Sequence, residues 1–304
     1  MTPADSMAMR DRHPASEVFD LRARGSGRGV KNAIATAMFA AAVVVVVVPL
    51  GVVVWSVVAR GAHIAFANFP AFFTREIPIV SRSQGPGVGP AIQGTLLVTG
   101  GATVIAAPLG ILGAVYLSEY GALSPFARLV RFMAMVMTGV PSIVMGLFVY
   151  VVWTIQFGFS AFGGALALAC LMLPIVIGST EQMLKLVPGS LREAAYALGA
   201  TKSRVIVTVV LPAALPGIVS GALLAIARAC GETAPLLFAV GAATSYNASF
   251  FNGANTALPM QIFDNATSAF VGAQDRAWGA AFTLVLLTFL MTLAARMFTL
   301  RFER

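Results

Sequence analysis

Long apolar windows with few or no charged residues recur along this chain of 304 residues. Each window holds about 20 residues or more, the length that an α-helix needs to cross roughly 30 Å of hydrocarbon. Strands of a membrane barrel would instead alternate in polarity over about ten residues. Hydrophobic residues make up 58% of the chain, charged residues 11%, and the mean hydropathy is +0.86. The chain is therefore predicted to be an all-α integral membrane protein.

Six windows are predicted to cross the membrane. They lie near residues 33–58, 91–117, 130–155, 162–182, 206–240 and 276–297. The first exceeds the 7–15 apolar residues of a signal-peptide core and lacks a small-x-small cleavage site, so it is expected to stay as an anchor helix. The fifth is too long for one straight crossing and contains Pro212, Pro216 and Pro235. It is expected to begin as a cytoplasmic helix and to kink.

Basic residues assign the orientation. Fifteen of the 20 Lys and Arg residues lie in residues 1–32, in the loops 118–131 and 183–205, or at the C-terminal end. Because cytoplasmic segments carry the excess of positive charge, both termini are predicted to be cytoplasmic. Residues 1–32 are polar, Gly-rich and without periodicity, so they are expected to form a flexible basic tail, whereas residues 33–304 form the transmembrane domain.

The sequence carries no catalytic or metal-binding motif. It has no GK[ST] of a Walker A loop and no HExxH. His13 and His63 are expected to be solvated, and Cys170 and Cys230 to be small core residues. The net charge is +8, and the basic residues flank hydrophobic windows, as topology signals do. No nucleic-acid motif accompanies them. The chain is therefore predicted not to be an enzyme, and neither a cofactor nor a nucleic acid is expected to bind it.

Arg228 and Glu232 stand four residues apart inside the fifth window. An ionised side chain in hydrocarbon costs at least about 2.5–3.5 kcal/mol, so both are expected to face a bundle interior or a watery cavity. One interpretation is a structural ion pair on a single helix face, although apolar residues would pack there without a desolvation cost. The other makes Arg228 a transient attraction point for an oxyanion, because guanidinium matches two oxygens in one plane. Glu232 would then moderate Arg228 and favour an anion that still carries a proton, as phosphate does and sulfate does not.

Further polar residues in the windows are candidates for the same path. Thr95, Thr99 and Thr103 recur every four residues on one face of the second window. Helix packing through their hydroxyls explains this spacing equally well. Ser142 follows Pro141, whose ring removes a backbone donor, and this pair is expected to expose carbonyls or to kink the third window.

The loop 183–205 carries the most informative pattern outside the membrane. Ser190, followed three residues later by Glu193, forms a capping-box pattern, so a short helix is expected to begin near Leu191. Gly199 can supply a left-handed turn, after which a second, basic helix is expected to run into the fifth window. Such a helix-turn-helix suits insertion into a groove of a partner, and a well-capped connector is the alternative.

The segment EAAYALGATKSRVIVTVVLP within and after this loop resembles the EAA loop of ABC importer permeases. The family pattern is EAA, a glycine a few residues on and an apolar-Pro end, and it is matched by Glu193, Ala194, Ala195, Gly199 and the Leu211-Pro212 end. In that family the loop transmits movement from a separate ATPase subunit. The resemblance therefore implies that the first four of these residues couple the chain to an ATPase.

Three further stretches, QGTLLVT at 93–99, GVPSIVMGLF at 139–148 and ARACGETAPLLF from residue 227, together resemble the PstA family of bacterial phosphate importer permeases. The likeness covers roughly residues 30–300. It implies a type I ABC importer permease (MetI-like) fold with six transmembrane helices in the bacterial plasma membrane. It also implies that the chain is half of a pore for inorganic phosphate.

The same resemblance implies the partners. They are a PstC-like permease, a PstB-like ATPase dimer that binds ATP and Mg, and a periplasmic-type phosphate-binding protein. Molybdate, sulfate or an organic solute is the alternative cargo. An intramembrane enzyme that uses Glu232 as an acid or base would need a second carboxylate, a histidine or a metal-ligand set beside it, and none accompanies Glu232 in its window. A passive channel would have no use for the docking helix of the cytoplasmic loop.

Overall fold

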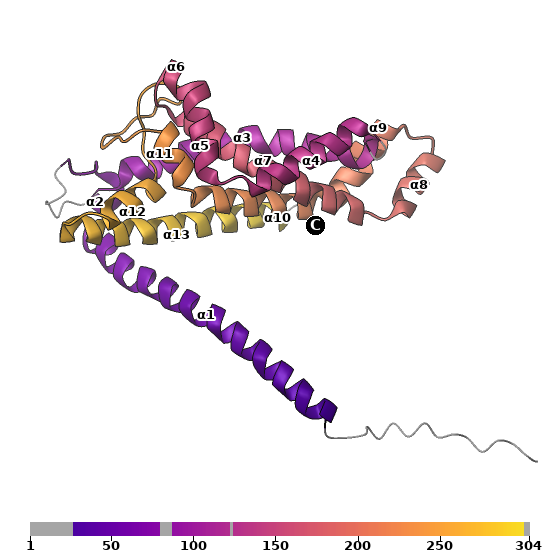
Figure 1. Cartoon of the computed structure of the whole chain (residues 1–304). Coiled ribbons are helices and arrows are strands. Elements are labelled where there is room, and N and C mark those ends of the chain that lie inside the picture. The colour runs from indigo at the N-terminus through magenta and orange to yellow at the C-terminus, as the bar shows by residue number, and fades with distance from the viewer. Residues whose placement is uncertain (1–26, 80–86, 122–123, 301–304) are drawn as a thin grey trace, which may run out of the picture. The chain divides into compact units, whose positions relative to one another are not determined.

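A computed structural model describes residues 27–79, 87–121 and 124–300 of the chain, and every regular element within them is a helix. The elements, with π-helices labelled η, are α1 (Gly27–Ala67), α2 (Ala71–Thr74), α3 (Gly89–Val115), η1 (Tyr116–Tyr120), α4 (Pro125–Gly139), α5 (Ser142–Val149), η2 (Tyr150–Thr154), α6 (Ile155–Phe157), α7 (Ala161–Leu186), α8 (Gly189–Ala197), α9 (Lys202–Val205), η3 (Ile206–Val210), α10 (Leu211–Cys230), α11 (Ala234–Ala239), α12 (Leu258–Ala266) and α13 (Val271–Leu300) (Figure 1). The chain divides into two compact units, residues 1–54 and 55–304.

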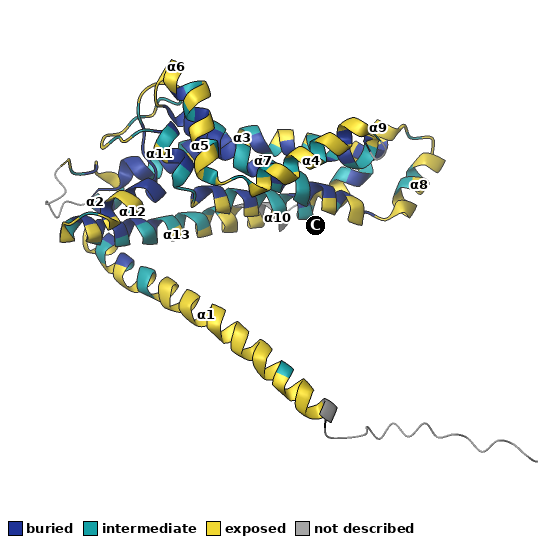
Figure 2. Cartoon of the chain, in the orientation of Figure 1, coloured by how far each residue is buried: buried dark blue, intermediate teal, exposed yellow. Residues whose placement is uncertain are grey.

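The described part of the first unit is the N-terminal portion of α1. This helix begins at Gly27, six residues before the start of the window at 33. No proline lies between the two positions, and the glycines fall in the first turns, where they interrupt the helix least. Its side chains in this unit are almost all exposed, including the valine run (Figure 2). An apolar helix exposed on every side suits contact with lipid or with another chain. The predicted flexible tail falls mostly on residues 1–26, which lie outside the described residues.

Five segments of the described chain are single helices long and apolar enough to cross a membrane. They are Gly29–Ala67, Gly89–Tyr120, Ala161–Leu186, Lys202–Cys230 and Val271–Ala294. A pair of helices, Pro125–Gly139 and Ser142–Phe157, meets at 107° and makes a sixth crossing when the two are counted as one broken span. Each of the six predicted windows therefore contains helix, and the third is broken.

Proline causes the break in the third crossing. The residue before a proline avoids the α-helical region, and Val140 is accordingly extended, with φ −72° and ψ 129°. Pro141 then caps the start of α5. The predicted kink is thus a complete interruption between α4 and α5.

The sequence predicted one kinked helix in the fifth window, but the structure has two separate helices there. Helix α10 ends at Cys230, and a separate helix, α11, follows a break at residues 231–233. Pro235 lies in the first turn of α11, where its missing N–H costs no helical hydrogen bond. Pro212 is the second residue of α10, just after η3, where a wider π-helical turn relieves the contact between its ring and the carbonyl four residues before it.

Small residues let the central helices of the second unit approach one another. Helix α3 packs along α7, and α10 packs on the same helix. A Cβ atom at Gly221 would overlap Ser179, so α10 needs glycine there, whereas one at Gly217 would require the flexible Met183 side chain to move. Figure 2 shows the buried residues gathered in α3 and α7. This is the packing expected where lipid gives no hydrophobic drive for helix association.

The loop between α7 and α10 forms the predicted helix-turn-helix, with one correction. Helix α8 begins at Gly189 rather than near Leu191, its N-cap is Pro188, and no side chain caps it. The Ser190 capping box is therefore not formed, because proline already fixes the entry to the helix. Gly199 has φ +78°, as the predicted left-handed turn requires.

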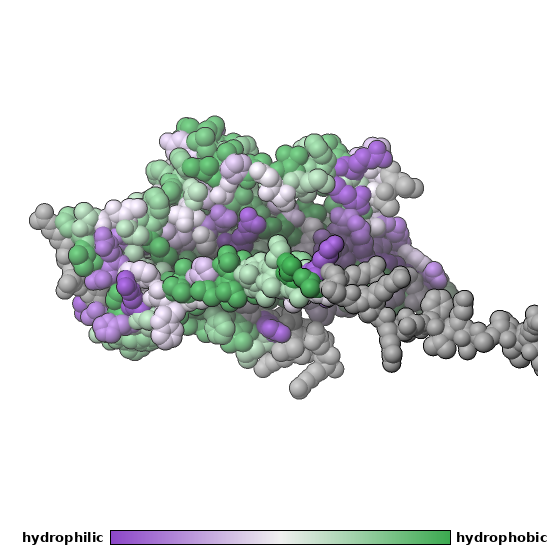
Figure 3. Space-filling model, turned by 60° about the horizontal axis from the view of Figure 1, so that its bottom comes forward, coloured by the Kyte–Doolittle hydropathy of each residue, from purple (hydrophilic) through white to green (hydrophobic). Residues whose placement is uncertain are grey.

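Helices α8 and α9 lie at the opposite end of the second unit from α12 (Figure 1). Figure 3 shows hydrophobic residues over most of one face, with hydrophilic ones mainly toward its ends.

Candidate functional site

The breaks in the third and fifth crossings lie close together. Helix α5, which follows the first break, packs on α11, which follows the second. A Cβ atom at Gly146 would lie 2.5 Å from the Cα atom of Pro235, so only glycine permits this approach. Two interrupted helices are thereby held with their broken ends on one side of α7.

A cavity of about 220 Å³ opens at these breaks. Its lining comes from the end of α4, the start of α5, the middle of α7 and the end of α10. Arg228, Glu232 and Ser142, three of the predicted path residues, line it together with Pro141 and Pro174. A cavity needs only about 10–15 Å³ to admit a water molecule, so this one has room for several waters or a small ion.

The pair Arg228–Glu232 is loose. Nε of Arg228 lies 3.6 Å from Oε1 of Glu232, whereas a charge-assisted N–H···O bond is about 2.7–2.9 Å. The Arg228 side chain is 66% exposed in this subunit and that of Glu232 20%. The structural interpretation placed the two on one helix face. They do not share one, because α10 ends at Cys230 and the backbone N–H of Glu232 donates to the Ala229 carbonyl.

The start of α5 adds donors beside this guanidinium. The first N–H groups of a helix have no partner within it, and no side chain caps α5. Ser142, the first residue of α5, is half-buried and lines the cavity. Half-helix N-termini, guanidinium and hydroxyl groups all suit an anion, and interrupted transmembrane helices bring such groups together in transporters.

The predicted threonines lie elsewhere. Thr95 is 2% exposed, and its hydroxyl accepts a hydrogen bond from the backbone N–H of Leu258 at 2.8 Å. Thr99 is equally buried, and its oxygen accepts from the thiol of Cys230 at 3.8 Å. Neither lines the cavity at the breaks. These contacts favour the packing interpretation, in which Thr95 fixes the start of α12 and Thr99 faces α10.

The predicted ATPase-coupling residues lie at the far end of the second unit. Glu193 and Ala194 are exposed on α8, Ala195 is half-buried, and Gly199 turns the chain toward α9. No residue of α8 is buried. Three apolar side chains on and after α8 are exposed, namely Leu191, Tyr196 and Leu198, the last of which is 89% exposed. Exposed apolar side chains on a short helix suit insertion into a partner's groove.

A cluster of charged side chains between α8 and the body of the unit was missed by the sequence analysis. Glu119 pairs with Arg192 at 3.0 Å, and Glu181 pairs with Arg131 at 2.9 Å and with Lys185 at 2.8 Å. The signal that could have found it is Glu181, a lone carboxylate within the window 162–182. Its partner on α4 lies 50 positions away in sequence, so the pairing itself is a tertiary feature.

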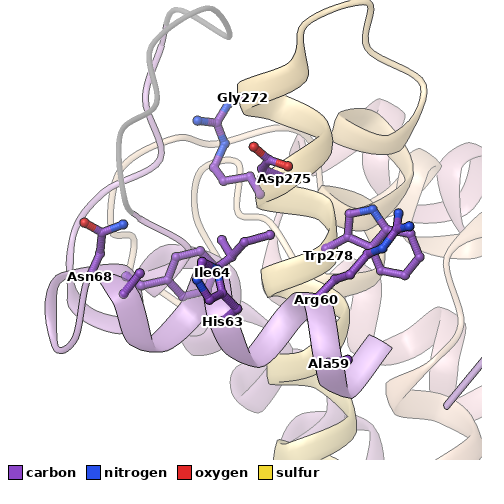
Figure 4. A pocket seen from close by; sticks show the side chains of 11 residues that line it. Ala59, Arg60, His63, Ile64, Asn68, Gly272, Asp275 and Trp278 are labelled. Atoms are coloured by element: carbon purple, nitrogen blue, oxygen red, sulfur yellow. The ribbon is translucent and has the colours of Figure 1, made fainter. Parts of the chain in front are cut away.

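A larger cavity of about 770 Å³ lies at the other end, between the last turns of α1 and the first turns of α13 (Figure 4). Its lining includes Arg60, whose guanidinium carbon lies 5.3 Å from the centre of the Trp278 ring, and exposed His63. Arg276 is 3% exposed and donates to Asn265 at 3.5 Å, and Asp275 lies beside it. A carboxylate beside two guanidinium groups gives the cavity mixed charge, and its lining shares no residue with the cavity at the helix breaks. Among the described residues, no group of three or more His, Cys, Asp or Glu side chains could hold a metal ion.

Comparison with known proteins places this geometry in a family. A family model described as "Binding-protein-dependent transport system inner membrane component" matches residues 106–304, which include both helix breaks and the α8 loop. The chain belongs to this family. A member is the transmembrane component of a transporter, and its ATPase and substrate-binding proteins are separate partners. The prediction that the chain is not itself an enzyme is confirmed.

Curated relatives refine the placement. The chain is 43% identical over 300 residues to "Phosphate transport system permease protein PstA 1" of Mycobacterium tuberculosis (strain ATCC 25618 / H37Rv), covering 98% of this chain and 96% of the relative. It is 46% identical over 231 residues to "Phosphate transport system permease protein PstA" of Yersinia pestis, covering 74% and 76%. The predicted likeness to PstA permeases is thereby confirmed.

A solved structure bears on the fold. The permease matches a chain of the inward-facing MetNI methionine ABC transporter with a TM-score of 0.56 and 21% sequence identity. The match covers 71% of this chain and 94% of that chain. The predicted MetI-like fold of a multi-pass membrane protein is confirmed.

Proposed function

We infer that this permease imports inorganic phosphate, and that the cavity at the two helix breaks is the point on its surface that meets the ion. Curated relatives at 43–46% identity are named phosphate transport permeases. The single observation that carries the assignment of the site is the convergence on one cavity of Ser142, from the third crossing, with Arg228 and Glu232, from the fifth.

The geometry suits transient binding. Among the described residues the guanidinium of Arg228 has one ion-pair contact, at 3.6 Å, so most of its N–H groups are available to an oxyanion. A well-solvated ion pair contributes little, about 0–1 kcal/mol, so the ion displaces Glu232 at small cost. The carboxylate then restores the pair when the ion leaves, which prevents Arg228 from retaining it.

Glu232 also favours the right anion. A protonated phosphate oxygen donates a hydrogen bond to a carboxylate, whereas sulfate at neutral pH has no proton to donate. The carboxylate of Glu232, whose side chain is 20% exposed, therefore gains a hydrogen bond from phosphate and none from sulfate. This difference discriminates phosphate from sulfate without a larger pocket.

The proposed assembly has four kinds of subunit. A PstC-like permease forms the other half of the pore, and a periplasmic-type phosphate-binding protein delivers the ion. A PstB-like ATPase dimer holds ATP and Mg and receives α8, whose exposed Leu198 and Leu191 suit an apolar groove. The permease lies in the bacterial plasma membrane with both termini in the cytoplasm, since fifteen of its 20 basic residues fall on that side.

Uptake by the assembled transporter tests the cargo. Cells that lack their own phosphate importers are given the permease with its partner subunits, and uptake of labelled phosphate is measured with excess sulfate or molybdate present. Uptake that neither competitor lowers supports phosphate. Uptake that molybdate or sulfate abolishes would assign the cavity to that oxyanion instead.

A further inference from the structure

The π-helix η1 at the end of α3 receives hydrogen bonds from three other helices. The Leu117 carbonyl accepts from Nη2 of Arg131 on α4 at 2.7 Å. The Glu119 carbonyl accepts from the ammonium of Lys202 on α9, and its carboxylate pairs with Arg192 on α8 at 3.0 Å. A π-helical turn shifts the backbone hydrogen-bond register, and such turns occur frequently at functional sites. All three donors are cationic, so these bonds are among the stronger ones available to a protein.

Arg192 anchors α8 at two places. Besides Glu119, its guanidinium donates to the Leu184 carbonyl at 2.8 Å and to the Val187 carbonyl at 3.2 Å. It therefore joins the ATPase-facing helix both to the end of α7 and to the end of α3. The side chains of Arg192 and Glu119 are 24% and 10% exposed, so the bridge is largely shielded from solvent.

Arg131 continues this connection toward the cavity. Its Nε donates to the Glu181 carboxylate at 2.9 Å while its Nη2 holds Leu117. Arg131 lies eight residues before Gly139, the last residue of α4, so about 12 Å of helix separates it from the break. The residues that follow, Val140 and Pro141, line the cavity beside Arg228.

We propose that η1 is the junction that couples α8 to the α4–α5 break. Movement of α8 and α9 reaches η1 through Arg192 and Lys202, and Arg131 passes it from Leu117 to α4, whose end forms one wall of the cavity. Arg131 and Arg192 are thus positioning residues for transport, and neither touches the ion. The inference rests on the proposed function, since the wall that moves belongs to the phosphate cavity.

Lys185 provides a matched control. Its ammonium contacts the same Glu181 carboxylate at 2.8 Å, but the two residues lie four positions apart on α7. A contact within one helix cannot transmit movement between helices. Loss of Lys185 therefore removes a charge of the same sign from the same carboxylate and leaves the junction intact.

The test uses the complete transporter in proteoliposomes, with phosphate uptake and ATP hydrolysis measured on the same sample. Arg131→Gln is expected to lower uptake at least tenfold while hydrolysis stays within twofold of the wild type, so that less phosphate enters per ATP. Lys185→Gln is expected to leave both within twofold. Proportional losses of uptake, hydrolysis and assembled complex in Arg131→Gln, or equal behaviour of the two variants, would overturn the proposal.

A charge exchange separates coupling from simple packing. Glu119→Arg and Arg192→Glu are each expected to uncouple transport, and the double variant to regain at least threefold more uptake than either single variant. No recovery in a double variant that assembles normally counts against the junction. Absence of phosphate uptake by the wild-type transporter would instead contradict the proposed cargo. In that case the stimulation of ATP hydrolysis by the binding protein, compared between the wild type and the variants, would still test the junction.

Discussion

Two ion pairs in this permease are built in opposite ways. At the end of the second unit that carries α8, Arg131 and Glu181 join different helices at 2.9 Å, and the carboxylate is 11% exposed and bonded a second time by Lys185. At the helix breaks, Arg228 and Glu232 are neighbours in sequence at 3.6 Å, and the guanidinium is 66% exposed. The first carboxylate is held at Oε1 by two cations, whereas the second pair is a single loose contact that leaves most donors of Arg228 available.

The difference separates two uses of charge in a membrane protein. A short, shielded bridge between helices contributes to stability and transmits force, because its partners cannot part without leaving a charge unpaired. A loose pair contributes little to stability and leaves its donors available to a ligand. One member of each pair is therefore neutralised in turn, and the change in phosphate uptake is compared with the change in melting temperature.

Arg228→Gln is expected to have the largest effect. Loss of the guanidinium removes the main attraction for the anion, and phosphate uptake should fall by about 100-fold, equivalent to about 2.7 kcal/mol. The melting temperature of the purified complex should stay the same, since the pair is weak. A loss of uptake fully explained by less protein in the membrane would instead make Arg228–Glu232 a structural pair.

Glu181→Gln should lower the stability of the complex more than Arg228→Gln does. It leaves Arg131 and Lys185 without their carboxylate, and because both cations are partly solvated the cost is discounted to about 1–2 kcal/mol. The melting temperature of the complex should drop by a few degrees in a thermal unfolding measurement. An unchanged melting temperature would show that the short bridge is no stronger than the loose one.

Glu232→Gln is expected to slow phosphate uptake by roughly fivefold, about 1 kcal/mol. The amide keeps the shape but no longer moderates Arg228 or accepts from protonated phosphate as strongly. Competition by sulfate should increase in the same variant, measured as inhibition of labelled phosphate uptake. Uptake unchanged at a normal protein level would remove Glu232 from the mechanism.

Ser142→Ala should have the smallest effect, a reduction of uptake of roughly twofold, about 0.4 kcal/mol. The hydroxyl is one neutral donor beside a guanidinium and the backbone N–H groups of α5, and neutral hydrogen bonds are about half as strong as charge-assisted ones. Thr95→Val is the matched comparison, because it removes a buried hydrogen bond outside the cavity. It should lower the melting temperature and leave the relative uptake of phosphate and sulfate unchanged.

Much of the fold was predictable from the sequence because membrane crossing is a local property. A window of about 20 apolar residues must form a helix whose backbone groups pair internally, whatever its neighbours are. Gly199 was predicted correctly for the same reason, since only the local turn requires its φ of +78°. The capping box at Ser190 failed because Pro188 determined the entry of α8 instead.

The site was only partly predictable. Arg228 and Glu232 were identified from the cost of charge in hydrocarbon, and Ser142 from its neighbouring proline. Thr95 and Thr99 looked equivalent by spacing, yet the structure places them in packing contacts, because helix periodicity gives a face and does not say what covers it.

The sequence by itself predicted the apolar crossings, the helix-turn-helix of the loop 183–205 and the charges that needed an explanation. Each follows from hydropathy, charge or turn chemistry within a few residues. Only the tertiary structure decided that two helix breaks share a cavity, that Arg131 meets Glu181 and the Leu117 carbonyl, and that Arg192 meets Glu119. Residues 50 or more positions apart in the chain are brought within 3 Å by packing of whole helices, which no local pattern encodes.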